Sequence, residues 1–214
     1  MRFHIVTLFP EAFSSYLASS IVGRAIRDEK ISVSFYNPRD FTEDKHRRVD
    51  RRPYGGGPGM VLEPTSVLAA AKKAIGTKKN VPVIFFSPAG KEFTGTTARA
   101  FARKHRDIVF IAGHYEGVDA RVVRALRATR LSVGPYVLSG GELPALVVID
   151  AVARQIPGVL GNAESLEEER TSSPDVYTRP ATFVWKGKRY SVPKVLRSGH
   201  HGEIEAWKQK RRGK

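Results

Sequence analysis

Short apolar runs of strand length alternate with helical patterns of hydrophobic residues over most of the chain. The runs expected to form strands are 3–9, 31–36, 81–86, 108–112 and 131–133, and the patterns expected to form helices are 13–26, 64–75, 96–105, 119–126 and 143–156. Strands that alternate with helices in this way form parallel sheets covered on both faces. The sequence therefore predicts an α/β fold built on a parallel sheet.

Three turns rich in glycine and proline come directly after expected strands. They are SPAG at Ser87–Gly90, AGHYEG at Ala112–Gly117 and SVGPYVLSGGELP at Ser132–Pro144. Glycine lets the backbone turn sharply and lie against a ligand without an intervening Cβ atom. One such turn would be an ordinary strand-to-helix connection, but three at the carboxyl ends of neighbouring strands predict a crevice that binds a small molecule.

A long polar stretch at residues 37–59 contains Tyr54 and a glycine run, Gly55–Gly59, beside a dense cluster of Arg and His. A loop of this length in a compact domain is more often functional than idle, although a disordered insertion has the same composition. The glycine run lacks the Gly-Lys-Ser/Thr of a phosphate-binding loop, and no G-x-G-x-x-G follows an expected strand. Sites for nucleoside triphosphates and dinucleotides are therefore disfavoured.

The formal charge of +15, from 36 Lys and Arg against 21 Asp and Glu, favours a polyanionic partner, above all nucleic acid. The positive charge is concentrated at Lys45–Arg52, Arg99–Arg106, Arg121–Arg130 and Lys208–Lys214. A merely basic surface is the alternative. A membrane surface is a weaker one, because these stretches do not share one amphipathic helix.

Several classes of protein are disfavoured by composition. The chain has no Cys, which excludes disulfides, thiolate metal sites and a Cys nucleophile. No apolar run approaches the roughly 20 residues of a membrane span, and the first residues do not resemble a signal peptide. We expect a cytoplasmic protein with no membrane partner.

The character of the chain changes after residue 160. We expect residues 1–160 to form the ligand-binding domain, and residues 161–180, which are polar and contain four Glu, to form an interdomain linker. Residues 181–214 predict a small helical appendage, with a hairpin around Lys186-Gly187-Lys188 and a helix at 203–211 that carries Trp207.

Six motifs in fixed order resemble those of the bacterial tRNA (guanine-37-N1)-methyltransferase family, TrmD. They are DRRPYGGGPGM (50–60), SPAG (87–90), AGHYEGVDAR (112–121), SVGPYVLSGGELPAL (132–146), RQIPGVLGN (154–162) and YTRP (177–180). The resemblance implies a fold of the SPOUT class, in which the parallel sheet ends in a deep trefoil knot. It also implies a homodimer that binds S-adenosylmethionine in the knot and methylates N1 of guanosine 37 in tRNA, with magnesium supporting the reaction.

Carried over residue by residue, the resemblance places the cofactor on the same three glycine-marked segments. The implied cofactor-binding residues are Phe86, Ser87, Pro88, Gly90, Gly113, Tyr115, Glu116, Gly117, Ser132, Val133, Gly134, Pro135, Tyr136, Val137, Leu138, Gly140, Gly141 and Pro144. Glycines there would permit close approach while backbone groups pair with the adenine edge. One of Tyr115 and Tyr136 is instead expected to be a core aromatic.

Methylation of guanine N1 requires loss of the N1 proton, while negative charge accumulates on O6. A general base and a cation are therefore needed. The resemblance assigns the cation to Arg154 and the base to a carboxylate of the linker, contributed by the other subunit. Gap-free counting gives Glu169, with Glu168 as the alternative; without the resemblance these would be a solvated acidic turn. No carboxylate cluster has the spacing of a metal site.

The chain departs from the family at several points. Pro135 stands where an Asp is usual, Arg51 replaces another Asp, the segment 170–176 is short, and the carboxyl-terminal region is shortened. Two alternatives therefore stay open. One is a knotted methyltransferase that acts on another RNA, and the other is a catalytically silent RNA-binding protein.

Overall fold

The computed structural model describes residues 1–161 and 175–212. The chain divides into two compact units, Met1–Gly161 and Asn162–Lys214, and each is described by itself. Within the described residues, no helix is long and apolar enough to cross a membrane.

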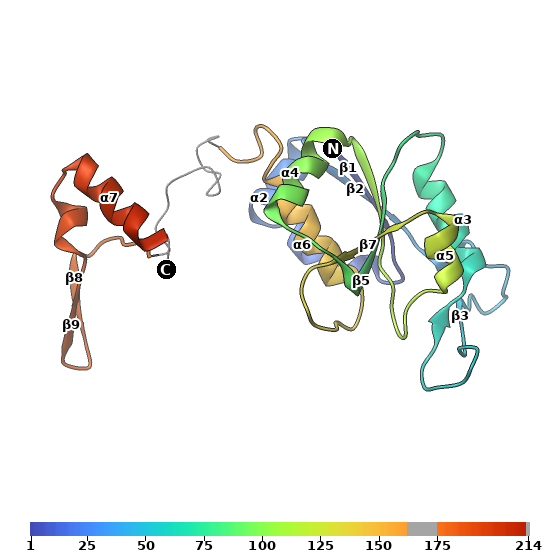
Figure 1. Cartoon of the computed structure of the whole chain (residues 1–214). Coiled ribbons are helices and arrows are strands. Elements are labelled where there is room, and N and C mark those ends of the chain that lie inside the picture. Colours follow the sequence, from blue (N-terminus) through green and yellow to red (C-terminus); the bar gives the residue numbers. More distant parts are fainter. Residues whose placement is uncertain (162–174, 213–214) are drawn as a thin grey trace. The chain divides into compact units, whose positions relative to one another are not determined.

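A five-stranded sheet forms the centre of the first unit (Figure 1). Its strands are β1 (Arg2–Val6), β2 (Ser32–Tyr36), β5 (Val83–Glu92), β6 (Asp107–Ile111) and β7 (Thr129–Ser132). They lie in the order β2-β1-β6-β5-β7, and every neighbouring pair is parallel. The predicted parallel sheet is therefore confirmed.

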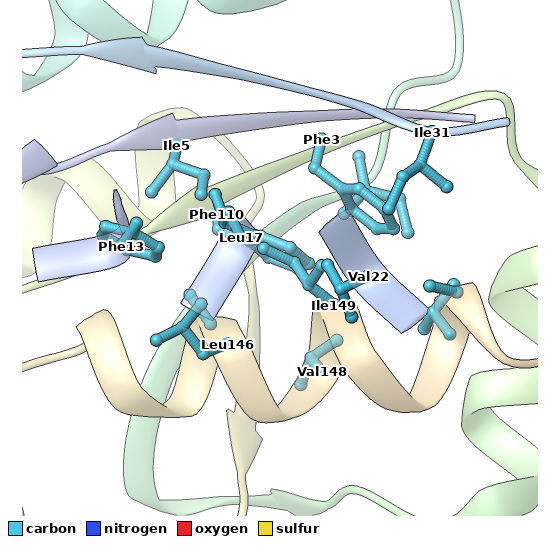
Figure 2. Close-up of a cluster of buried hydrophobic side chains, with 14 of the residues drawn as sticks. Phe3, Ile5, Phe13, Leu17, Val22, Ile31, Phe110, Leu146, Val148 and Ile149 are labelled. Atoms are coloured by element: carbon cyan, nitrogen blue, oxygen red, sulfur yellow. The ribbon is translucent and has the colours of Figure 1, made fainter. Parts of the chain in front are cut away.

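Helices cover both faces of this sheet, as the alternating pattern predicts. One face packs against η1 (Pro10–Phe13), α1 (Ser14–Leu17), α2 (Ser20–Arg27), α4 (Gly95–Lys104) and α6 (Glu142–Ala153). The other packs against α3 (Pro64–Ile75) and α5 (Ala120–Ala125). Figure 2 shows the first of these cores, where Phe3 and Phe110 of the sheet meet Ile149 of α6.

Two expected elements differ from the structure by more than the position of their ends. The helix expected at 13–26 is interrupted before Ser20, which has a left-handed φ of 50°. The strand expected to end at Phe86 continues to Glu92, because Leu131 of β7 pairs with both Phe86 and Lys91. The turn Ser87–Gly90 is thus a bulge within β5, and its residues protrude from the ladder.

Residues 37–59 also contain ordered elements. A 3₁₀ turn, η2 (Pro38–Asp40), follows Asn37, whose side chain accepts a hydrogen bond from the Arg39 amide. The strand β3 (Asp50–Arg51) then pairs with β4 (Val61–Leu62) in an antiparallel ribbon. This ribbon contains the glycine run at its tip.

The second unit contains the expected hairpin and helix. Strands β8 (Thr182–Trp185) and β9 (Lys188–Ser191) are antiparallel, and η5 (Lys194–Arg197) and α7 (His201–Arg212) follow. Trp207 of α7 packs edge-on against Tyr177, with the Arg211 guanidinium 4.8 Å from the indole centroid. The ring contact with Tyr177 and an ion pair between Arg211 and Asp175 hold α7 against the chain that precedes the hairpin.

Candidate functional site

A cavity of about 350 Å³ lies where the segments after β6 and β7 meet the bulge of β5. This volume is in the usual range for small-molecule sites, about 300–1,000 Å³. Its walls come from all three glycine-marked segments, Ser87–Pro88, Gly113–Gly117 and Ser132–Gly141. The order β6-β5-β7 explains the convergence, because the three strands are neighbours.

Among the expected cofactor-binding residues, all but Gly90 and Pro135 line this cavity. Gly90 packs against the next strand instead. A Cβ atom there would lie 2.5 Å from the backbone nitrogen of Leu131, so the glycine is needed for the close approach of β5 and β7. Gly90 thus serves the packing of β5 against β7, whereas Ser87 and Pro88 of the same bulge line the cavity.

The cavity wall also contains residues that the sequence did not single out. They are Phe85, His114, Val118, Arg130, Leu131 and Ser139. Arg130 is notable because it adds a cation to a cavity whose wall also contains the carboxylate of Glu116. The basic run Arg121–Arg130 predicted contact with nucleic acid, and no neighbouring residue marks Arg130 as different from the other arginines of the run.

Direct backbone contact joins two of the cavity-lining segments. The Gly141 amide donates a hydrogen bond of 2.8 Å to the Gly113 carbonyl. A Cβ atom on Gly141 would lie 2.5 Å from Cα of Ala112. Only glycine fits this contact. At Gly134 the atoms nearest to an added Cβ belong to the side chain of Tyr136, whose hydroxyl donates to the Val133 carbonyl.

These observations define a site on a parallel α/β sheet, and comparison with known proteins assigns its family. The sequence profile described as "tRNA (Guanine-1)-methyltransferase TrmD" matches residues 1–214. The chain belongs to this family.

Individual relatives agree with the family assignment. A tRNA (guanine-N(1)-)-methyltransferase of Clostridioides difficile is 44% identical over 215 residues, covering 98% of this chain and 91% of the relative. Proteins of the same name from Pseudoalteromonas atlantica and Colwellia psychrerythraea are 45% and 47% identical and cover 97% and 96% of this chain. The chain in turn covers 78% and 84% of those two relatives. The predicted membership of the TrmD family is confirmed.

A buried polar cluster lies behind the cavity wall of this TrmD family member. The Thr7 hydroxyl at the end of β1 donates to Oε1 of Glu142, the first residue of α6. Oε2 of the same carboxylate is 3.8 Å from Nδ1 of His114. Gly140 leaves room for this pair, since a Cβ there would lie 2.2 Å from the carboxylate and 2.6 Å from the imidazole. His114 thus connects the core to the cavity.

The neighbour of this histidine, Tyr115, has a left-handed φ of 58°, which is uncommon for a tyrosine. Its ring meets the His114 imidazole edge-on, with 4.9 Å between the ring centroids. On the other side, His114 packs 4.7 Å from the ring of Phe9. Tyr115 remains half-exposed, so its ring is available to a ligand in the cavity.

The long loop is tied to the same wall. The Glu116 amide donates to the Met60 carbonyl, and the Leu62 amide donates to the Gly117 carbonyl. A Cβ on Gly59 would lie 2.6 Å from Oε1 of Glu116. The glycine run therefore brings the Arg- and His-rich loop beside the cavity.

Asp44 organises the basic part of this loop. Its carboxylate accepts hydrogen bonds from the Arg48 guanidinium and from the backbone amides of His46 and Arg48. The Arg48 side chain is the main cause that lowers the pKa of Asp44 to about 2. Arg51 also lies within 4.0 Å of this carboxylate. Asp44 is therefore an anion that orders neighbouring cations.

Of the expected catalytic residues, Arg154 alone lies within the described part of the chain. Arg154 is half-buried at the carboxyl end of α6 and is outside the cavity lining. Glu168 and Glu169 lie outside the described residues. Within 1–161 and 175–212, no group of three or more His, Asp or Glu side chains could hold a metal ion.

Proposed function

We propose that this protein transfers a methyl group from S-adenosylmethionine to N1 of guanosine 37 in tRNA. The observation that carries the proposal is the cavity lined by Gly113–Gly117 and Ser132–Gly141 in a chain of the tRNA (guanine-1)-methyltransferase family. The family defines the reaction, and the cavity supplies a site of suitable size for the donor.

The cavity has features that suit the donor. Backbone groups of Val133–Leu138 are available to the adenine edge, and Phe85 offers an apolar wall. Glu116 and Arg130 give the cavity one group of each charge, which matches a ligand that carries both an ammonium and a carboxylate. The donor, when bound, supplies a methyl group on a sulfonium. The residues present therefore fit S-adenosylmethionine.

The chemistry at guanine requires two groups from the protein. A carboxylate would accept the N1 proton, and a cation would stabilise the charge that develops on O6, while the bond between the methyl carbon and the donor sulfur breaks and the donor leaves as a neutral thioether. We assign these roles to Glu169, with Glu168 as the alternative, and to Arg154. The target base must leave its stack, at a cost of roughly a few kcal/mol that is lowest in an unpaired loop.

We further propose that the active unit is a homodimer built on α6. Leu143 and Val147, one turn apart on this mostly apolar helix, are 58% and 48% exposed. Large apolar side chains that gather on an exposed face often mark a protein–protein contact. The exposed Tyr16 ring lies beside the same helix, since its pKa is raised by burial and by the nearby Asp150. Docking of a second copy would cover this surface and could supply the partner's linker carboxylate.

The trefoil knot also belongs to the proposal. It is supported by the contact of Gly141 with the backbone of Ala112 and Gly113, where the chain after β7 lies directly on the chain after β6. We propose residues 1–160 as the knotted domain, 161–180 as the linker and 181–214 as a tRNA-binding segment. Any magnesium would accompany the RNA, and a tRNA substrate implies work in the cytoplasm.

The test is methyl transfer from labelled S-adenosylmethionine to an unmodified tRNA transcript with guanosine at position 37. The matched control is the same transcript with adenosine at that position. Label in the first transcript alone is the expected result. Donor binding without transfer to either transcript would indicate another RNA substrate, and absence of donor binding would indicate a silent RNA-binding protein.

A further inference from the structure

The β8–β9 hairpin has one face made of aromatic side chains. Phe183 pairs with Tyr190 and Trp185 pairs with Lys188, so these four residues share a face of the two-stranded sheet. The rings of Phe183 and Tyr190 are stacked, with centroids 5.3 Å apart and an angle of 14° between planes. The Lys188 ammonium lies 5.7 Å from the centroid of Tyr190.

This aromatic face is uncovered within its own unit. Phe183, Trp185 and Tyr190 are 54%, 62% and 41% exposed. Figure 1 shows the hairpin projecting away from α7. No other part of this unit that the structure describes covers the three rings, and a cluster of exposed aromatic side chains of this kind marks a surface that is available to a partner.

The charge around the face indicates the kind of partner. Residues 175–212 contain ten Lys and Arg against three Asp and Glu. Lys186, Lys188 and Arg189 lie in the hairpin itself. A second copy of this hairpin would meet it with like charge. A polyanion with flat apolar rings fits both properties, and such a polyanion is a nucleic acid with unpaired bases.

We propose that the face formed by Phe183, Trp185 and Tyr190 stacks unpaired nucleotides of the RNA substrate, while Lys188 and its neighbours contact phosphates. The proposal rests on the proposed function in that the RNA is a tRNA. It goes further by assigning the hairpin a specific mode of contact through stacking, which tolerates different bases.

The first experiment measures binding of the full-length protein to an unmodified tRNA transcript at fixed salt. Phe183→Ala and Trp185→Ala should each weaken binding roughly 5- to 150-fold, the range for loss of one stacked base. The control is Val184→Ala, because Val184 is exposed on the opposite face of the same strand. Equal affinities for the three variants would overturn the proposal.

The salt dependence of the same titrations separates stacking from charge. Loss of a ring removes no phosphate contact, so the slope of log K against log salt should stay that of the wild type. Lys188→Gln should instead make that slope shallower. A ring variant that changes the slope, or one that dissociates a dimer in sedimentation, would contradict the stacking mode.

The second experiment uses Trp185 as its own reporter. The chain has two Trp, so Trp207→Phe leaves Trp185 as the one indole. Addition of the tRNA transcript should quench its fluorescence, and the matched variant Trp185→Phe, which keeps Trp207, should be quenched less. Absence of quenching under conditions where the transcript binds would overturn the proposal. Neither readout requires methyl transfer, so failure of the proposed reaction would be seen separately.

Discussion

Oε2 of Glu142 lies 3.8 Å from Nδ1 of His114, while Oε1 accepts the hydroxyl hydrogen of Thr7. This buried carboxylate is the first residue of α6, where the positive end of the helix dipole favours an anion. It therefore joins three parts of the fold, namely β1, the segment after β6 and α6. We infer that the arrangement positions His114, and through it Tyr115, in the cavity wall.

Replacement of this carboxylate tests that role. Glu142→Gln should lower the free energy of unfolding by about 1–3 kcal/mol, because it removes a buried charged acceptor at a helix start. It should also weaken donor binding by displacing His114. Urea unfolding and calorimetry measure the two effects. Glu11→Gln, at an exposed glutamate, is the matched control and should change stability by less than about 0.5 kcal/mol.

Two glycines of the same segment should differ in their tolerance of a methyl group. Gly141→Ala places a Cβ atom 2.5 Å from the backbone of Ala112. A backbone atom cannot rotate away as a flexible side chain can. We expect this substitution to destabilise by about 1–3 kcal/mol and to lose donor binding. At Gly134 the nearest atoms belong to the half-exposed Tyr136 side chain, which can move, so Gly134→Ala should be milder. Thermal unfolding and calorimetry compare them with Gly161→Ala, where the space is open; equal effects at Gly141 and Gly161 would contradict the contact.

Acid should weaken the amino-terminal edge of the sheet through Asp107. Burial alone would raise the pKa of this carboxyl, but hydrogen bonds from Arg2, at 2.8 and 2.7 Å, and from His4 outweigh it, so the pKa lies below its ordinary value. A carboxyl whose pKa is lower in the folded state stabilises the folded protein. This stabilisation is complete at pH values above the unfolded-state pKa of about 3.9, and it is lost as the pH falls toward the folded-state pKa.

The Asp107→Asn variant isolates this contribution. It should be less stable than the wild type at pH 6 by roughly 1.5–3 kcal/mol, since hydrogen bonds to a charged group are lost. The difference should narrow when urea unfolding is repeated near pH 3. An unchanged difference between the two pH values would show that the carboxyl is not the titrating group. Ser66→Ala, at a buried hydroxyl of α3 with no hydrogen-bond partner among the described residues, supplies a pH-independent comparison.

Local signals sufficed for much of this fold. Helix α3 has the predicted bounds because Pro64 begins it and Gly76, with φ 58°, ends it. The order β6-β5-β7 could not be read from the chain, since it depends on long-range pairing. The bulge that continues β5 to Glu92 depends on the same pairing with β7.

In the candidate site, too, the sequence predicted the features that depend on local residues and missed those that depend on long-range pairing. Glycine turns after apolar runs marked the segments that line the cavity, because their chemistry is local. Arg130 and His114 were not singled out, since their place in the wall follows from the register of β7 and from the approach of Gly140 to His114. Glu142 is the buried partner of His114, and nothing in the residues around Glu142 indicates that its carboxylate is buried beside a histidine.

The outer surface of α6 predicts the state of assembly. Val147→Glu would place a charge in the proposed subunit interface and should weaken self-association at least tenfold, because a buried unpaired charge costs several kcal/mol. Sedimentation of the full-length protein measures this. Val176→Glu changes another exposed valine and should leave association unchanged. Similar behaviour of both variants would place the interface elsewhere.

Replacement of Arg154 tests its assigned role in stabilising charge on O6 separately from binding of the donor. This residue follows the last residue of α6, half-buried and outside the cavity lining, so Arg154→Ala should leave donor affinity nearly unchanged. Loss of a group that stabilises charge on O6 should reduce the rate of methyl transfer by at least about 10²- to 10³-fold. The removed charge near a helix end should cost only about 0.3–1 kcal/mol of stability.

The matched control for this prediction is Arg27→Ala, at an exposed arginine that ends α2. It removes a similar helix-end charge and should retain normal transfer. Single-turnover methyl transfer and calorimetry with the donor give the two readouts independently. If Arg154→Ala lost donor binding and transfer in parallel, the residue would be maintaining the donor site. If it lost neither, the developing charge on O6 would be stabilised by another group.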